Sequence, residues 1–197
     1  RIWGEKSPGH AYYWPQIKQC FPDAKVVHIV RDGRDAAISL LGARFGPKTH
    51  YAAAKTWQRY LAQMEEVRSS CQAEQFCQIH YEELIESPEA TLGTICAHLN
   101  IDYSASMLRF FENSTAYRTD DVNERNLQKP LLRANKNKWR QTMTFMQICE
   151  FEAVAASELV RYGYDLGGNY KSLAPTREMY IRFISSPAKR LVARAED

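Results

Sequence analysis

The stretch KVVHIVRDGRDAAISL, which runs from Lys25 to Leu40, decides the predicted fold. Its residues Val26 to Val30 are apolar or aromatic and mostly β-branched, which is typical of a buried strand in a parallel sheet. A charged cluster interrupts the run, and the apolar residues after it predict a helix over Ala36 to Ala43. This order of strand, turn and helix predicts Arg31 at the carboxyl end of a strand, where open α/β sheets bind ligands.

Arg31 is the leading candidate for binding an anion. The N-terminus of the following helix offers N–H groups and the positive end of a dipole, and the guanidinium adds a planar fork that suits phosphate oxygens. Ser39 follows about two helical turns later and can offer a hydroxyl to the same anion. The alternative is that the arginines of the cluster form ion pairs with its aspartates in solvent, and the sequence fits both interpretations (Arg31 and Arg34 with Asp32 and Asp35).

The flanking residues make the pattern more specific. The segment from Lys25 to Ser39 resembles the 3′-phosphate-binding segment of the sulfotransferase family, whose donor is 3′-phosphoadenosine-5′-phosphosulfate. In that family a strand runs into an arginine, and a serine eight positions later joins it on the 3′-phosphate of the donor. Arg31 and Ser39 match in residue type and spacing, so the resemblance implies that both bind the nucleotide.

Three further segments resemble the same family. WGEKSPGH (Trp3 to His10) is similar to a short strand that ends in Lys-Ser/Thr-Pro. IHYEELIESPEATLGTICAHLNI (Ile79 to Ile101) is similar to a Tyr-Glu-Asp/Glu-Leu strand end followed by Asp/Ser-Pro-Glu and a helix. RANKNKWR (Arg133 to Arg140) resembles the basic loop that closes over the nucleotide. The four segments occur in the family's order and cover about Trp3 to Leu166.

The resemblance assigns roles to individual residues. Lys6 is the catalytic candidate, as the ammonium that donates to the oxygen bridging sulfate and nucleotide; its alternative is a solvated lysine. Tyr81 matches the residue that touches the adenine; its alternative is a packed tyrosine at the end of a strand. Lys136 and Lys138 are the candidates for the 3′-phosphate within the basic segment, although charged runs are usually solvated faces.

The general base is not assigned by the sequence. The cytosolic branch of the family has Lys-Thr-His where this chain has Lys6, Ser7 and Pro8, so Pro8 replaces the catalytic histidine of that branch. Glu5 and His10 lie near in sequence, and neither is preferred. The implied co-substrate is 3′-phosphoadenosine-5′-phosphosulfate, without a metal, and the implied acceptor is a hydroxyl or amine on a small molecule, carbohydrate or protein.

Strands that alternate with helices predict an α/β fold with a parallel sheet. Strands are expected at Arg1–Glu5, Val26–Val30 and Phe76–Tyr81. The resemblance implies a P-loop-NTPase-like, three-layer arrangement with helices on both faces of the sheet. Other helices are expected at His10–Cys20, Tyr51–Cys71, after Ser87, at Ser104–Phe111 and from Thr144 to near Gly163. Two of them have a predicted core-facing stripe, at Tyr51–Cys71 (Ala54, Trp57, Leu61, Met64 and Val67) and in the last helix (Ile148, Phe151, Ala155 and Leu159). Thr144 and Gln147 resemble a capping box that opens the last helix.

Residues 1–166 are expected to form a sulfotransferase domain, and residues 167–197 a helical tail. No Ser/Thr- and Gly-containing loop for the 5′-phosphosulfate is found in the sequence, and no Walker-type motif. We therefore expect an N-terminally truncated domain that lacks the strand, loop and helix of that site and is inactive in isolation. A P-loop kinase or nucleotide hydrolase would need a Walker lysine and Mg²⁺ ligands. A non-catalytic nucleotide-binding or structural relative remains the third interpretation.

Composition excludes several other classes. With 45% hydrophobic and 25% charged residues the chain is an ordinary globular protein, and its net charge of +3 does not indicate a nucleic-acid binder.

Five cysteines without Cys-x-x-Cys spacing disfavour a structural zinc site. Cys20, Cys96 and Cys149 are expected to be buried thiols, and Cys71 and Cys77 can pair only in an oxidising compartment. The cysteines favour a cytoplasmic location, with a membrane-tethered or Golgi location left open. No apolar run reaches the ~18 residues of a membrane-spanning helix.

Overall fold

The computed structural model describes residues 2–44, 46–113 and 126–167. The chain divides into two units. Unit 1 consists of Arg1–Arg31 and Met64–Lys136, and unit 2 of Asp32–Gln63 and Asn137–Asp197. Residues 114–125 and most of the predicted tail, residues 168–197, lie outside the described residues. The domain boundary at residue 166 therefore stays a prediction.

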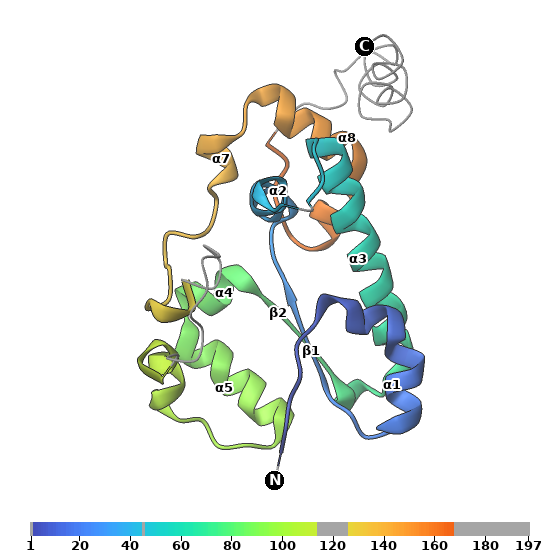
Figure 1. Cartoon of the computed structure of the whole chain (residues 1–197), viewed down its shortest axis with the longest axis vertical. Coiled ribbons are helices and arrows are strands. Elements are labelled where there is room, and N and C mark those ends of the chain that lie inside the picture. The colour runs from blue at the N-terminus through green and yellow to red at the C-terminus, as the bar shows by residue number, and fades with distance from the viewer. Residues whose placement is uncertain (1, 45, 114–125, 168–197) are drawn as a thin grey trace. The chain divides into compact units, whose positions relative to one another are not determined.

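Unit 1 is built on a parallel pair of strands, β1 (Val26–Val30) and β2 (Phe76–His80), which lie side by side in Figure 1. The register pairs Val26 with Phe76 and Val30 with His80. The predicted parallel sheet and the bounds of β1 are thus confirmed. Burial of β1 is uneven, since Val30 is 1% exposed but Ile29 is 48% exposed. One face of this sheet is therefore open near Ile29 within the described part of the chain.

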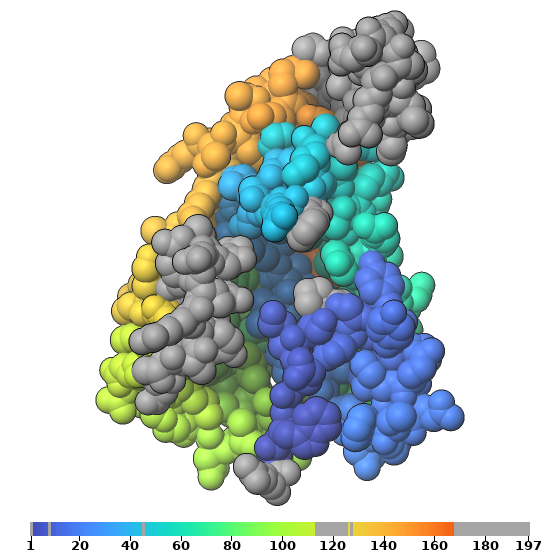
Figure 2. Space-filling view, in the orientation of Figure 1, coloured from blue at the N-terminus to red at the C-terminus, as the bar shows by residue number. Residues whose placement is uncertain are grey.

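The predicted strand at Arg1–Glu5 is wrong for the residues that the structure describes. Residues 2–7 form neither helix nor strand and are exposed, and the dark blue N-terminal segment lies on the surface in Figure 2. Its Trp3 ring makes an edge-on contact with Phe21, with centroids 5.5 Å apart. Gly4 disfavours a strand, and an extended segment becomes a strand only where a neighbour pairs with its N–H and C=O groups.

The helix expected at His10–Cys20 is two elements, the 3₁₀ helix η1 (Pro8–Tyr13) and α1 (Trp14–Cys20). Pro15 has no N–H to continue an α-helical ladder back into η1, which explains the change of helix type. The buried face at this junction includes Trp14, which is 8% exposed, and not Tyr13, which is 64% exposed. Trp14 Nε1 donates to Ser70 Oγ at 2.7 Å. The core of unit 1 gathers around these residues (Ala11, Trp14 and Val67, with Ile17, Ala24, Val26, Met64, Cys71 and Phe76).

Most of the remaining elements of unit 1 come after β2 in the chain. Tyr81 is not the last residue of a strand, as expected, but the first of a short helix, α4 (Tyr81–Glu86). The helix expected after Ser87 is α5 (Pro88–Leu99), and it packs against β2. The helix expected at Ser104–Phe111 is of the 3₁₀ type, η3 (Ala105–Asn113). Two short 3₁₀ turns complete the unit, η2 (Ala73–Gln75) and η4 (Asn126–Gln128).

Unit 2 is helical, with α2 (Gly33–Gly42), residues 50–63 of α3 (His50–Ser70), α7 (Trp139–Thr142) and α8 (Phe145–Arg161). Helix α2 begins three residues before the predicted start because Asp32 caps it, with Oδ1 accepting from the Arg34 N–H at 2.9 Å. Gly33 allows the close packing there. A methyl group on it would lie 2.5 Å from the Trp57 ring and 2.7 Å from the Phe151 ring.

Two predicted helices, α8 and α3, are confirmed in detail. The Thr144 and Gln147 capping box opens α8, with both hydrogen bonds formed. The predicted stripe of α8 is buried throughout (Ile148, Phe151, Ala155 and Leu159). The predicted stripe of α3 is buried at Ala54, Trp57, Leu61 and Val67, and half-buried at Met64.

The five cysteines, all within the described ranges, form no disulfide. Cys96 and Cys149 are buried as predicted, but Cys20 is exposed because the buried face of α1 is that of Trp14. Burial raises the pKa of the Cys71 and Cys77 thiols. In the part of the chain that the structure covers, no helix combines the length and hydropathy needed to cross a bilayer.

Candidate functional site

Arg31 and Tyr81 meet where the two parallel strands end. The last paired residues are Val30 of β1 and His80 of β2, so the next residue of each strand lies at the same edge of the sheet. The guanidinium carbon of Arg31 lies 4.7 Å from the centroid of the Tyr81 ring. Parallel pairing in this register therefore brings together two residues that the resemblance had assigned to the nucleotide.

Asn135 completes this arrangement. Arg31 Nη2 donates to the backbone oxygen of Asn135 at 2.9 Å and, at 3.3 Å, to its side-chain Oδ1. Asn135 Nδ2 in turn donates to the Tyr81 hydroxyl oxygen at 2.8 Å. We call Arg31, Tyr81 and Asn135 the strand-end triad. Asn135 was not among the predicted site residues. Its position inside the basic segment RANKNKWR is the one sequence feature that could have indicated it.

Lys136, the residue after Asn135, gives the basic segment a second contact with α4. Lys136 forms an ion pair with Glu86, the last residue of α4, while Asn135 bonds to Tyr81, the first residue of that helix. Two consecutive residues therefore hold the basic segment along both ends of α4. Both side chains of the ion pair are partly exposed, 31% for Lys136 and 52% for Glu86. Solvent screening leaves such a pair with little stabilising effect.

The other predicted site residues are exposed. Lys6 lies in the irregular N-terminal segment of unit 1. Ser39 lies on α2 and Lys138 at the start of α7, both in unit 2. Arg31 belongs to unit 1, so its convergence with Ser39 and Lys138 on one phosphate stays a prediction.

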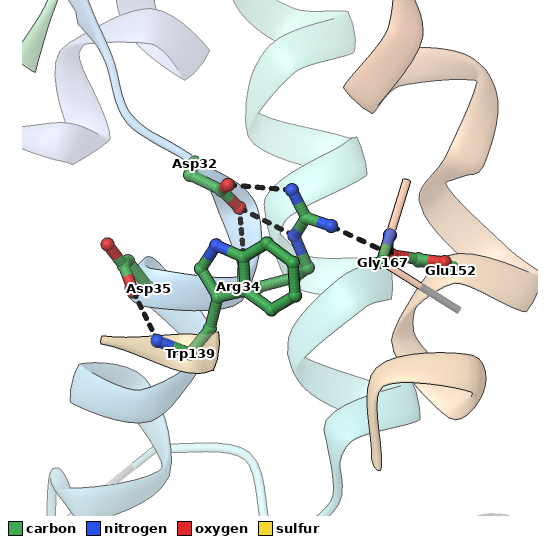
Figure 3. Close-up of polar contacts among 6 residues, drawn as sticks. All are labelled: Asp32, Arg34, Asp35, Trp139, Glu152 and Gly167. Carbon is green, nitrogen blue, oxygen red and sulfur yellow. Dashed lines mark hydrogen bonds and ion pairs between the residues drawn. The ribbon is translucent and has the colours of Figure 1, made fainter. Parts of the chain in front are cut away.

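Arg34 has a different environment, drawn in Figure 3. Its side chain is 1% exposed and bonds to Asp32 through two nitrogens, Nε to Oδ1 at 3.0 Å and Nη2 to Oδ2 at 2.8 Å. Its third nitrogen, Nη1, donates to Glu152 Oε1 at 2.8 Å, and Glu152 is completely buried. The alternative is therefore confirmed in the ion pair between Arg34 and Asp32, but it is wrong about the solvent, because the pair is buried and α8 adds a second carboxylate.

Trp139 covers this ion cluster, with its ring 3.6 Å from the guanidinium carbon of Arg34. The backbone N–H of Trp139 donates to Asp35 Oδ1 at 2.9 Å, and the N–H of Gly167 donates to Glu152 Oε1 at 2.7 Å (Figure 3). A methyl group on Gly167 would lie 2.5 Å from the Trp139 ring. Trp139 is 1% exposed, so it anchors the basic segment by packing inside the fold. We call Asp32, Arg34, Asp35, Trp139 and Glu152 the Arg34 cluster.

No group of three or more histidine, cysteine, aspartate or glutamate side chains within 2–44, 46–113 and 126–167 is arranged to hold a metal ion.

Comparison with known proteins identifies the family of the chain. Residues 1–105 match the sulfotransferase family, a range that includes Lys6, Arg31, Ser39 and Tyr81 but not the basic segment. A curated relative, "Putative protein-tyrosine sulfotransferase" of Caenorhabditis briggsae, is 29% identical over 112 residues, which are 54% of this chain and 40% of the relative.

Two solved structures share the fold. The sulfotransferase domain from the curacin biosynthetic pathway is 19% identical, with a TM-score of 0.61, over 82% of this chain and 62% of that domain. The sulfotransferase domain of the Synechococcus PCC 7002 olefin synthase is 23% identical, with a TM-score of 0.64, over 82% of this chain and 58% of that domain. The chain thus spans less than two thirds of each of these relatives. The family match over more than half of its residues nevertheless identifies it: the chain belongs to the sulfotransferase family.

Proposed function

We propose that this chain supplies the nucleotide-binding part of an enzyme that transfers a sulfuryl group from 3′-phosphoadenosine-5′-phosphosulfate to a hydroxyl or amine acceptor. The observation that carries the proposal is the strand-end triad. Arg31 follows β1 directly, its guanidinium lies over Tyr81, and its Nη2 donates to Asn135. A guanidinium at the carboxyl end of a parallel strand offers a positive charge and planar donors that suit a phosphate.

Each nucleotide contact in this proposal has a chemical reason. Arg31 binds the 3′-phosphate through charge-assisted hydrogen bonds, and the Ser39 hydroxyl donates to the same group. Tyr81 contacts the adenine. Lys138 and Lys136 add positive charge from the basic segment, and Lys136 exchanges its partly exposed ion pair with Glu86 for the phosphate.

The transfer itself is an in-line displacement. The acceptor oxygen or nitrogen bonds to sulfur as the bond between sulfur and the bridging oxygen breaks, and adenosine 3′,5′-bisphosphate leaves. Negative charge builds up on the bridging oxygen, and the ammonium of Lys6 is positioned by its motif to stabilise it. The acceptor's proton passes to a base, for which Glu5 and His10 are candidates near Lys6 in sequence.

We further propose that the complete domain has the three-layer, P-loop-like architecture and contains elements outside this sequence. The exposure of Ile29 on a sheet of two described strands supports further cover there. The chain also spans only 62% and 58% of two solved sulfotransferase domains. The loop that binds the 5′-phosphosulfate would belong to these elements, and residues 1–197 alone would then transfer little or no sulfate.

The acceptor class is open to direct test. The curated relative is named for protein tyrosine, so a tyrosine-containing peptide belongs in the acceptor panel beside small-molecule alcohols, amines and carbohydrates. The complete protein is assayed with labelled donor and each acceptor, with and without Mg²⁺. We expect transfer without metal, and a strict metal requirement would favour a kinase-like enzyme instead.

Arg31→Ala tests the binding assignment in the same protein. We expect it to weaken binding of adenosine 3′,5′-bisphosphate by about 1.5–3 kcal/mol, the range for a charged hydrogen bond. Arg59→Ala is the matched control, because Arg59 is exposed on α3. Unchanged affinity in Arg31→Ala would refute the assignment. Bisphosphate binding without any transfer, whether Lys6 is intact or replaced, would favour a non-catalytic nucleotide-binding protein.

A further inference from the structure

The strand-end triad contains one residue that the nucleotide assignments do not explain. Asn135 uses its backbone oxygen and its Oδ1 as acceptors for Arg31, and its Nδ2 as a donor to Tyr81. Its side chain is half-buried. A residue on a loop thus links two side chains that emerge from the ends of neighbouring strands, 104 and 54 residues away in sequence.

We infer that Asn135 is a positioning residue that sets the orientation of Arg31 toward the 3′-phosphate and thereby contributes to discrimination between 3′-phosphorylated and 3′-unphosphorylated adenine nucleotides. This inference rests on the proposed function. It adds a residue to the site and states what that residue does to specificity.

The chemistry of the amide explains why asparagine suits this position. An arginine side chain has many rotamers, and fixing it has an entropic cost that a preformed hydrogen bond removes before the ligand arrives. Asn135 accepts from Arg31 through uncharged oxygens, so it orients the guanidinium without adding a negative charge beside the phosphate. A carboxylate at this position would orient the guanidinium equally well but would repel the phosphate.

The Nδ2 group of Asn135 is also part of the arrangement, as a hydrogen-bond donor. The bond from Nδ2 to the Tyr81 hydroxyl holds the side chain of Asn135. Removing that side chain leaves the backbone oxygen that accepts from Arg31 Nη2 but removes the bond that anchors Asn135 to Tyr81.

The experiment compares adenosine 3′,5′-bisphosphate with adenosine 5′-monophosphate, which lacks the 3′-phosphate, as ligands of the complete protein. Asn135→Ala should weaken bisphosphate binding about 3- to 10-fold, the effect of one hydrogen bond, and monophosphate binding by less than about 2-fold. Asn135→Asp, which is nearly isosteric, should weaken bisphosphate binding at least as much because of charge repulsion. In the Arg31→Ala background, Asn135→Ala should have little further effect, since coupled residues are not additive.

The controls separate this inference from the proposed function. Gln141→Ala removes an exposed amide of α7 and should change neither affinity. If Arg31→Ala weakens bisphosphate binding selectively but both Asn135 variants leave the ratio of the two affinities unchanged, Asn135 has only a structural role and the inference is wrong. If Arg31→Ala has no effect either, the 3′-phosphate assignment fails and the inference fails with it.

Discussion

Arg31 and Arg34 are three residues apart in sequence and have opposite environments. Arg31 is half-buried at the end of β1, and its Nη2 donates to the backbone and side-chain oxygens of Asn135. Arg34 is buried, and its three side-chain nitrogens bond to the carboxylates of Asp32 and Glu152. The same side-chain type thus bonds to an amide residue at a strand end in one region and to two carboxylates inside the fold in the other.

The difference shows that the hydrogen-bond and ion-pair partners of an arginine decide whether its charge is neutralised, even for two arginines in the same segment of sequence. Two carboxylates more than compensate one guanidinium, so the Arg34 cluster has no positive charge left to attract an anion. Removing a charge from a buried cluster is costly because the remaining charges lose their partner. We therefore expect Arg34 to determine stability and Arg31 to determine binding.

The largest expected effect is that of Arg34→Ala. It leaves Asp32 and Glu152 buried without their cation and removes the contact with the Trp139 ring, so we expect the free energy of unfolding to fall by about 3–5 kcal/mol. Urea denaturation measures this change. Arg34→Met, which keeps the volume but not the charge, should also destabilise the protein. A loss below about 1 kcal/mol in both variants would contradict the comparison.

Gly33→Ala tests the packing around the same cluster. The added methyl group would lie 2.5 Å from the Trp57 ring, so neighbouring groups must shift, and we expect a loss of about 1–3 kcal/mol in the free energy of unfolding. Gly42→Ala is the control at the other end of α2, where a methyl group would have no neighbour within 4 Å. Equal effects of the two substitutions in thermal or urea unfolding would rule out the close packing.

Arg31→Ala should have a smaller effect on stability. It removes a hydrogen bond and a cation–π contact at a half-buried position, while Asn135 and Tyr81 keep the bond between them, so we expect a loss of about 1 kcal/mol. Unfolding by urea without ligand gives this value. A loss as large as that of Arg34→Ala would show that Arg31 is equally structural and would remove the contrast between the two arginines.

The smallest effect concerns His28 on β1, a potential cation without a carboxylate hydrogen-bonded to it. Burial lowers the pKa of His28 below its ordinary value of 6.5, outweighing the raising effect of the hydrogen bond with Gln78, and His80 lowers it further. Below pH 6.5 the unfolded chain therefore binds a proton that the folded protein resists, and stability falls as the pH falls toward the folded pKa.

The variant His28→Gln should therefore lose less stability than the wild type between pH values above and below 6.5. Urea unfolding at several pH values measures the difference in slope. His50 and His98, whose pKa values burial also lowers, remain in both proteins and act as the internal reference. A steeper slope for the variant would give the opposite sign and contradict the assignment of burial as the cause.

The sequence by itself determined the features that depend on neighbours in the chain. The apolar run Val26–Val30 became β1 with the predicted bounds because five β-favouring residues between polar flanks have few other ways to be buried. The capping box at Thr144 and the stripe of α8 were equally readable, since hydrogen bonds and periodicity within one helix are local. The position of Arg31 directly after β1 followed from the same local pattern.

Only the tertiary structure decided which distant groups meet. Asn135 and Glu152 come from segments more than 100 residues beyond their arginines, and no local pattern could assign one to Arg31 and the other to Arg34. Tertiary structure also overruled the expected strand at residues 2–5, because an extended segment needs a pairing partner. Parallel strands, buried ion pairs and loop contacts are long-range by nature. The sequence therefore specified most of the elements, and packing selected the partners that distinguish Arg31, for which we propose nucleotide binding, from Arg34 inside the fold.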